Sequence, residues 1–305
     1  MTYLCVDGGQ TKTAVVLLDD DGVRVHAWQT RPLTTPSRPG AIDNLRLMVR
    51  ELAEELRRRL ARDGSQWPKV ACFSLTGYLE GDELVPSTVR EEVRRVLPET
   101  EKIQTVPDYV GNWAAATRGE PGIVVISGGG AVAYGRTALG DSLRVGGWGH
   151  LLGDEGSGYW IGLEATKAAL RSWAGIIPKT ALEWRVMETL GAEDDRQVLG
   201  RVYSGSFSEA EIAGLVLLVA SLARDDDELS DRILDEAAYH LASMAEAVQK
   251  KLGELPIYLS GGVFGVVTMP ERFERALVGL GRDTMVMTVI PDPLDGVFLI
   301  AREGL

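Results

Sequence analysis

The sequence predicts an α/β protein made of two similar units with a central ligand-binding cleft and an all-helical insertion in the second unit. Three observations predict this class. Short β-branched runs alternate with stretches whose apolar residues recur every three or four positions. The order of these elements repeats along the chain, and three of the predicted strands end in two or three glycines. Repeated α/β units commonly bind a ligand in the crevice between them.

The first unit is expected to have the order βββαβαβ. A hairpin meander opens it, because an Asp-Asp-Asp-Gly turn at 19–22 joins two alternating runs. An amphipathic helix follows, with its apolar stripe set by spacings of three and four. The predicted strands are 3–7, 12–18, 22–29, 70–75 and 103–106, and the predicted helices are 41–62, 87–97 and 109–117.

The second unit is expected to start with the same order and then to be interrupted by helices. Its predicted strands are 123–127, 131–136, 142–145, 256–259 and 285–289, and its crossover helix is 155–172. Helices at 179–190, 195–203, 208–223 and 228–252 form the insertion, and further helices are expected at 270–280 and from 293. The resulting domains are 1–112, 113–292 and a C-terminal helix 293–305 that is expected to return to the first unit.

Composition limits the classes of function. The 305 residues, 45% of them hydrophobic, are enough for two ordinary cores. A net charge of −12, from 32 basic and 44 acidic residues, disfavours a nucleic-acid partner. Apolar runs fall short of the roughly 18 residues that span a bilayer, and a strand pattern opens the chain in place of a leader, so we expect a cytoplasmic protein without a membrane partner. Cys5 and Cys72 lie in apolar runs, which favours packing over a disulfide or a cluster.

The glycine turns are candidate phosphate-binding sites. Glycine allows backbone N–H groups to approach an anion closely, although a single such turn is more often a simple strand end. Next to the first turn, Asp7 is a candidate ligand of hydrated Mg²⁺. The spacing does not match a P-loop, and the third turn is expected to border the nucleoside. The predicted nucleotide-binding residues are Gly8, Gly9, Gln10, Thr11, Lys12, Thr13, Gly128, Gly129, Gly130, Gly261 and Gly262.

Asp108 is the candidate general base. It follows a predicted strand and Pro107 at the junction of the two units, where a carboxylate would project into the expected cleft. A positioned carboxylate that accepts the proton of an acceptor hydroxyl is a standard device in phosphoryl transfer. The alternative is an N-cap of the helix 109–117, and the two roles are compatible.

The densest local pattern lies between Gly146 and Trp160, where eight glycine or tryptophan residues surround His150, Asp154 and Glu155. Paired carboxylates beside flexible turns favour recognition of carbohydrate hydroxyls. Alternatively, Asp154 caps the next helix with Glu155 in its first turn. We interpret the pair of acids as functional and the aromatic residues of this block as structural.

These motifs resemble the N-acetylglucosamine kinases of the BadF-type ATPases, within the actin-like sugar-kinase superfamily. The resemblance rests on Asp7-Gly-Gly-Gln-Thr-Lys-Thr13, Pro107-Asp-Tyr-Val-Gly-Asn112, Ser127-Gly-Gly-Gly130, the block from Gly146 to Gly162, and Ser260-Gly-Gly262. It implies two ribonuclease H-like domains, the cofactors ATP and Mg²⁺, transfer to the 6-hydroxyl of a sugar, and a homodimer. It also implies the substrate-binding set Thr35, Ser74, Thr76, Gly77, Asp108, Gly146, Asp154 and Glu155.

Two departures from the family pattern concern the acceptor. The second turn has Gly129 where the family usually has threonine, and Pro36 stands where relatives often place an asparagine that contacts the sugar. Arg38 in the same loop either meets an acidic substituent, as on a muramic-type sugar, or faces solvent. The acceptor is therefore expected to be N-acetylglucosamine, with glucosamine, glucose and N-acetylmuramic acid as alternatives.

Two other classes of protein share this fold. Energy-coupling ATPases that activate acyl-CoA dehydratases or reductases hold a bridging iron–sulfur cluster through cysteines, and Cys5 and Cys72 are badly placed for one. A non-catalytic sugar sensor would not need both Asp108 and the phosphate turns. The sequence therefore favours the kinase.

Overall fold

The structure is a computed structural model that describes residues 1–34 and 38–305. The chain forms two compact units, one of Met1–Glu120 with Pro291–Leu305 and the other of Pro121–Ile290. The sequence-based domains 1–112 and 113–292 differ from these units chiefly in that the helix after Pro107 lies wholly within the first. Thr35, which is expected to bind the substrate, and Pro36, which departs from the family pattern, lie outside the described residues.

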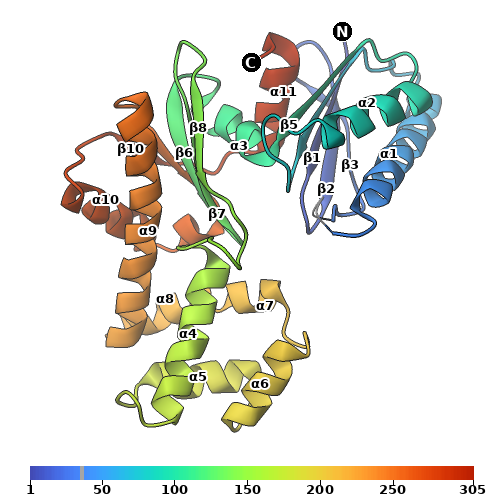
Figure 1. Cartoon of the computed structure of the whole chain (residues 1–305). Helices are drawn as coiled ribbons and strands as arrows, with labels where there is room; N and C mark the ends of the chain where they lie inside the picture. The colour runs from blue at the N-terminus through green and yellow to red at the C-terminus, as the bar shows by residue number, and fades with distance from the viewer. Residues whose placement is uncertain (35–37) are drawn as a thin grey trace. The chain divides into compact units, whose positions relative to one another are not determined.

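Unit 1 contains a five-stranded sheet in the order β3-β2-β1-β4-β5 (Figure 1). The first three strands are antiparallel, whereas β1, β4 and β5 are parallel. Because parallel neighbours need a crossover, helices connect the second half of the sheet. The strands are β1 (Tyr3–Gly8), β2 (Thr13–Leu18), β3 (Arg24–Thr30), β4 (Val70–Leu75) and β5 (Lys102–Pro107).

Helices cover both faces of this sheet (Figure 1). Alternate side chains of a strand point to opposite faces, so Leu4 and Val6 join the core beneath α1 (Ala41–Asp63) and α2 (Leu84–Val96). Tyr3 points the other way and packs edge-on against Phe298 of α11 (Pro293–Glu303) at 5.2 Å. The sheet is therefore buried on both faces.

The helix α3 (Asp108–Thr117) crosses α11 at two glycines. A Cβ at Gly296 would lie 2.1 Å from the backbone oxygen of Gly111 and 2.4 Å from the backbone nitrogen of Ala115. A Cβ at Gly111 would lie 2.3 Å from Ser74 Oγ in β4. Glycine is required at this crossing because the two backbones touch.

Unit 2 repeats the same sheet topology, in the order β10-β9-β6-β7-β8. Here β6, β7 and β8 form the antiparallel meander, and β6, β9 and β10 are parallel. The expected two copies of one α/β arrangement are therefore confirmed. The strands are β6 (Gly122–Ser127), β7 (Ala131–Arg136), β8 (Ser142–Gly146), β9 (Ile257–Ser260) and β10 (Val286–Thr288).

A helical stretch separates β8 from β9, as the sequence predicts (Figure 1). The helix expected at 208–223 is two helices, because the chain breaks at Leu215. A Cβ at Gly162 of α4 would lie 1.9 Å from the backbone oxygen of Ile212, so α7 packs backbone-close on α4. The helices of this stretch are α4 (Gly158–Trp173), α5 (Ala181–Leu190), α6 (Asp195–Tyr203), α7 (Glu209–Gly214), α8 (Val216–Arg224) and α9 (Glu228–Leu252), and α10 (Met269–Gly279) follows β9.

No helix within residues 1–34 and 38–305 combines the length and the apolar character that a membrane crossing needs.

Candidate functional site

In unit 1, several of the predicted catalytic and ligand-binding residues lie at the carboxyl end of the parallel strands. Asp7 of β1 pairs in register with Ser74 of β4, and Leu75 of β4 pairs with Pro107 of β5. Thr76 and Asp108 come directly after that last pair, and the backbone N–H of Thr76 donates to the carbonyl of Gly8 at 2.9 Å. Carboxyl ends of parallel strands are where open α/β sheets present ligand-binding groups.

Asp108 is the first residue of α3, and Pro107 occupies the N-cap position. The alternative in which Asp108 itself is the N-cap is therefore wrong by one position. Its half-buried carboxylate accepts hydrogen bonds from the Thr76 side chain and from the backbone N–H groups of Tyr109 and of Asp108 itself. Burial raises the pKa of the Asp108 carboxyl, and these hydrogen bonds oppose the rise.

Asp7 is half-buried among other acids. Burial, together with the charges of Asp108 and Asp292, raises the pKa of Asp7 to about 6, while Lys12 opposes the rise. A carboxylate under such repulsion is stabilised by a bound cation. Within the part of the chain that the structure describes, no three His, Cys, Asp or Glu side chains form a metal site by themselves. Mg²⁺ typically binds one or two carboxylates together with phosphate oxygens and water.

The sequence reasoning placed a helix from Pro293 but overlooked Asp292. Asp292 is the N-cap of α11, and its carboxylate accepts from the backbone N–H of Leu294 at 3.0 Å. Arg24 of β3 holds it at 2.6 Å. An aspartate directly before a proline that opens a helix is an N-cap signal, so the position was recognisable. Its proximity to Asp7 was not.

The first glycine turn closes the β1–β2 hairpin. The backbone N–H of Gly9 donates to the carbonyl of Lys12 at 2.9 Å, and the intervening Gln10 and Thr11 are exposed. Gly8 serves packing, because a Cβ there would lie 2.7 Å from the side chains of Leu33 and Leu75.

Two hydroxyls of the predicted set are enclosed by unit 1. Thr13 and Ser74 are fully buried, and neither hydroxyl has a hydrogen-bond partner among the described residues. Ser74 lies beneath Gly111 of α3. Gly77, with a φ of 85°, turns the chain just after Thr76. Thr76 and Gly77 are therefore better placed than Ser74 to meet a ligand.

In unit 2, the second glycine turn joins β6 to β7. Gly128 and Gly129 do not have a positive φ, and a Cβ at either would meet nothing within 4 Å. Neither conformation nor internal packing therefore requires glycine at these two positions. The open space leaves room for a ligand to approach the backbone of this turn closely.

The buried carboxylate of Asp154 supports this turn. It is 8% exposed, and its carboxylate accepts from the backbone N–H of Ala131 at 3.2 Å and from that of Gly149. A Cβ at Gly130 would lie 2.9 Å from its Oδ2. Burial raises the pKa of the Asp154 carboxyl, and the bond from Ala131 opposes the rise. Asp154 is not the cap of α4, because Ser157 holds that position by accepting from Trp160 N at 3.1 Å.

The third turn touches the second. Gly261 has a φ of 104°, and a Cβ there would lie 2.3 Å from the backbone oxygen of Ser127. Ser127 Oγ in turn donates to the carbonyl of Gly156 at 2.9 Å, and the N–H of Gly158 donates to the carbonyl of Gly128 at 2.8 Å. A single network therefore holds the second and third turns and the residues that open α4.

The remaining members of the 146–160 block differ in environment. Gly146 has a φ of 80°, and Glu155 is half-buried beside Gly153. Trp160 packs against the ring of His240 at 5.3 Å, as a structural aromatic should. Trp148, however, is 57% exposed and is not part of the core.

Two sheets of this topology with a helical stretch in the second unit define an actin-like ATPase fold. A solved structure supports this assignment. The chain matches the crystal structure of a candidate N-acetylglucosamine kinase from Chromobacterium violaceum with a TM-score of 0.75 and 23% identity, over 98% of both chains. Residues 4–293 match the BadF/BadG/BcrA/BcrD ATPase family model, and the chain belongs to that family. Membership implies ATP binding.

Two relatives have names that specify an activity. A Clostridium acetobutylicum protein named N-acetylmuramic acid/N-acetylglucosamine kinase is 33% identical over 232 residues, which are 74% of this chain and 76% of the relative. A Dictyostelium discoideum protein named N-acetyl-D-glucosamine kinase is 30% identical over 320 residues, covering 99% of this chain and 98% of the relative.

Proposed function

We propose that this chain is an ATP-dependent sugar kinase that phosphorylates the 6-hydroxyl of a hexose or amino sugar, with N-acetylglucosamine as the leading acceptor. The two relatives named as kinases of this sugar, at 33% and 30% identity, support this choice. The observation that carries the nucleotide-binding part is the pair Gly128 and Gly129, where a Cβ would meet only open space.

The proposed chemistry uses few side chains. Asp108 accepts the proton of the sugar hydroxyl as that oxygen attacks the γ-phosphorus and the bond from this phosphorus to the β,γ-bridging oxygen breaks. The hydrogen bond from Thr76 orients the Asp108 carboxylate. Mg²⁺, held through Asp7, would neutralise charge that develops on the phosphate oxygens. Backbone N–H groups of the glycine turns would supply the remaining stabilisation.

Within this proposal, the acceptor-binding residues are those of the resemblance, and the structure adds a distinction between two of them. Thr76 touches the general base, whereas Asp154 supports the Gly130 turn with its carboxylate. In this proposal, Asp154 has two roles: it binds sugar hydroxyls, as the resemblance implies, and it supports the phosphate turn. Its replacement by alanine is expected to weaken sugar binding, and an unchanged sugar dissociation constant would leave it only the supporting role.

A panel of acceptors tests the proposed activity. The protein is mixed with Mg·ATP and N-acetylglucosamine, glucosamine, glucose or N-acetylmuramic acid, and ADP release is measured together with the site of phosphorylation. We expect release that depends on N-acetylglucosamine and a 6-phosphate product. ADP release that does not depend on any of these sugars would overturn the proposal.

N-Acetylmuramic acid is the second candidate acceptor, because the relative with 33% identity is named for both sugars. In the same panel, a larger kcat/KM for N-acetylmuramic acid would assign it as the preferred substrate.

A homodimer also belongs to this proposal and is tested by the mass of the protein in light scattering.

The variant Gly128→Ala tests the phosphate turn. An alanine there meets no internal atom, so the thermal unfolding midpoint should stay the same or rise slightly, while ATP binding weakens. Gly200→Ala is the matched control, since that glycine of α6 also has open space around it and lies outside the turns. Equal ATP affinity in parent and Gly128→Ala would remove this turn from the nucleotide site.

A further inference from the structure

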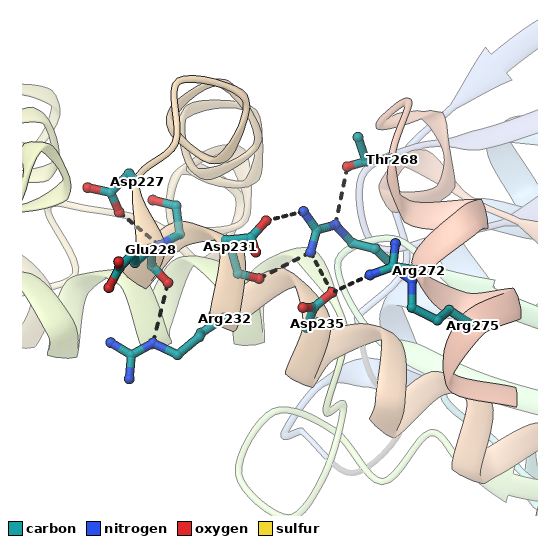
Figure 2. A network of polar contacts seen from close by, with 9 residues as sticks. Asp227, Glu228, Asp231, Arg232, Asp235, Thr268, Arg272 and Arg275 are labelled. Atoms are coloured by element: carbon teal, nitrogen blue, oxygen red, sulfur yellow. Dashed lines mark hydrogen bonds and ion pairs between the residues drawn. The ribbon is translucent and has the colours of Figure 1, made fainter. Parts of the chain in front are cut away.

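The helix that follows the third glycine turn shares an apolar core with its neighbour and also contacts it through a buried arginine. Arg272 of α10 is only 9% exposed and contacts two carboxylates of α9 that lie one turn apart (Figure 2). Its guanidinium pairs with Asp231 and, at 2.5 Å, with Asp235. It also donates to the backbone oxygen of Asp231 at 3.3 Å and to Thr268 Oγ1 at 3.4 Å. These contacts join α10 to two successive turns of α9.

The third turn follows β9, which pairs with β6, and the 3₁₀ segment after the turn packs against α10. Phe273, next to Arg272, packs edge-on against Phe264 in the short 3₁₀ helix Gly262–Gly265, with ring centroids 5.9 Å apart. The N–H of Met269 donates to the carbonyl of Val266 at 3.0 Å, which joins the 3₁₀ segment to the start of α10. Gly261, just before this segment, has no room to move toward Ser127.

Burial of an ion pair is a weak source of stability, because desolvation offsets most of the attraction. A planar guanidinium that bridges two carboxylates is, however, geometrically specific. We therefore expect Arg272 to affect the position of the 3₁₀ segment and turn that precede α10 more than the free energy of folding.

We propose that Arg272 is a positioning residue for the nucleoside, which acts by holding the Gly261-Gly262 turn against the Ser127 turn through α10. The proposal rests on the proposed nucleotide-binding function of these turns. Arg272 does not touch the ligand in this account. Its removal should let the third turn shift, which weakens contacts to the base and ribose but leaves contacts to the phosphates intact.

The test compares Arg272→Met and Arg272→Lys with the parent. Asp231 and Asp235 are 47% and 49% exposed, so the methionine variant leaves no buried unpaired carboxylate and is expected to fold. We expect the dissociation constant of ATP to rise about three- to thirty-fold, the usual range for a residue that acts through its neighbours. Inhibition by inorganic tripolyphosphate, kcat and the KM of the sugar should change by less than about two-fold. Arg272→Lys should recover part of the ATP affinity.

Arg50→Met is the matched control. Arg50 also joins two helices through a carboxylate, 2.6 Å from Glu92, but it lies between α1 and α2 of unit 1. Equal ATP affinity in parent and Arg272→Met, equal weakening by Arg50→Met, or equal weakening of ATP and tripolyphosphate would each overturn the positioning role. A parent protein that does not bind ATP would instead reject the proposed function.

Discussion

At the residue scale, the proposed proton acceptor is Asp108. Its carboxylate is positioned at the first residue of α3 and accepts a hydrogen bond from the Thr76 side chain. We predict that Asp108→Asn lowers kcat by at least ~10²-fold, the usual scale for loss of a general base. Asparagine keeps the size and one acceptor oxygen, so α3 should form normally and ATP should bind as in the parent. Steady-state ADP release and calorimetric titration with ATP measure the two quantities. Turnover similar to that of the parent would exclude Asp108 as the base.

Asp7 gives a prediction about pH. Its pKa is about 6 in the folded chain, above the ordinary value of 3.8, because of burial, Asp108 and Asp292, with Lys12 opposing. The folded state therefore carries a penalty for ionised Asp7. This penalty is absent below the unfolded pKa, grows as pH rises through the window between 3.8 and about 6, and is complete above it.

Asp7→Asn should therefore raise the unfolding temperature of the free protein at about pH 7.5, and the difference should vanish near about pH 4. The same variant should lose stabilisation by Mg·ATP, since the amide does not replace a carboxylate toward Mg²⁺. Thermal unfolding at several pH values, with and without Mg·ATP, measures both effects. A variant less stable than the parent at neutral pH, or a difference that does not depend on pH, would contradict this interpretation.

At the scale of elements, the crossing of α3 and α11 is the tightest helix contact of unit 1. We predict that Gly296→Ala destabilises the protein by roughly 1–3 kcal/mol, because the added methyl group would overlap the backbone atoms of Gly111 and Ala115. Unlike a flexible side chain, these backbone atoms cannot rotate out of the way. Gly279→Ala at the end of α10 is the control, since its Cβ would meet nothing within 4 Å. Urea unfolding gives both values. Equal midpoints for the two variants would mean that the helices separate at little cost.

The same scale shows what the sequence could predict. Periodicity located most of the strands and helices, because both sheets are buried and their helices have one apolar stripe. It missed the break at Leu215, because the approach of α7 to Gly162 is set by a distant segment. It offered Asp154 as the cap of the helix that Ser157 caps in the structure, since both residue types cap well.

The candidate site was predictable to a similar degree. Asp7 and Asp108 follow from strand ends, which the sequence marks with glycine and proline, whereas Thr76 is expected only from the family resemblance. The burial of Ser74 beneath Gly111 depends on how α3 lies on the sheet, and local pattern carries no information about that contact. The proximity of Asp292 to Asp7 also depends on a long-range contact, because the C-terminal helix returns to unit 1 and brings Asp292 with it.

At the scale of the whole molecule, the two units differ in how the chain builds them. Unit 2 is continuous from Pro121 to Ile290, whereas unit 1 needs both ends of the chain. Its helix α11 covers the face of the sheet on which Cys5 and Cys72 stand side by side in register. Both thiols are fully buried, and they are the two cysteines of the sequence. Burial also raises the pKa of each thiol.

We therefore predict that a chain ending at Ile290 exposes both thiols to a thiol reagent, while the intact protein reacts slowly. Loss of α11 uncovers the apolar surface of β1, β2 and β4 on which this helix packs, so the sheet of unit 1 should open, whereas unit 2 keeps its own core. Hydrogen exchange should accordingly be fast in β1 and β4 and slow in β6 and β7. A chain that lacks only Gly304 and Leu305 is the control, because it retains all of α11. Thiols that stay unreactive in the chain ending at Ile290 would show that unit 1 folds without its C-terminal helix.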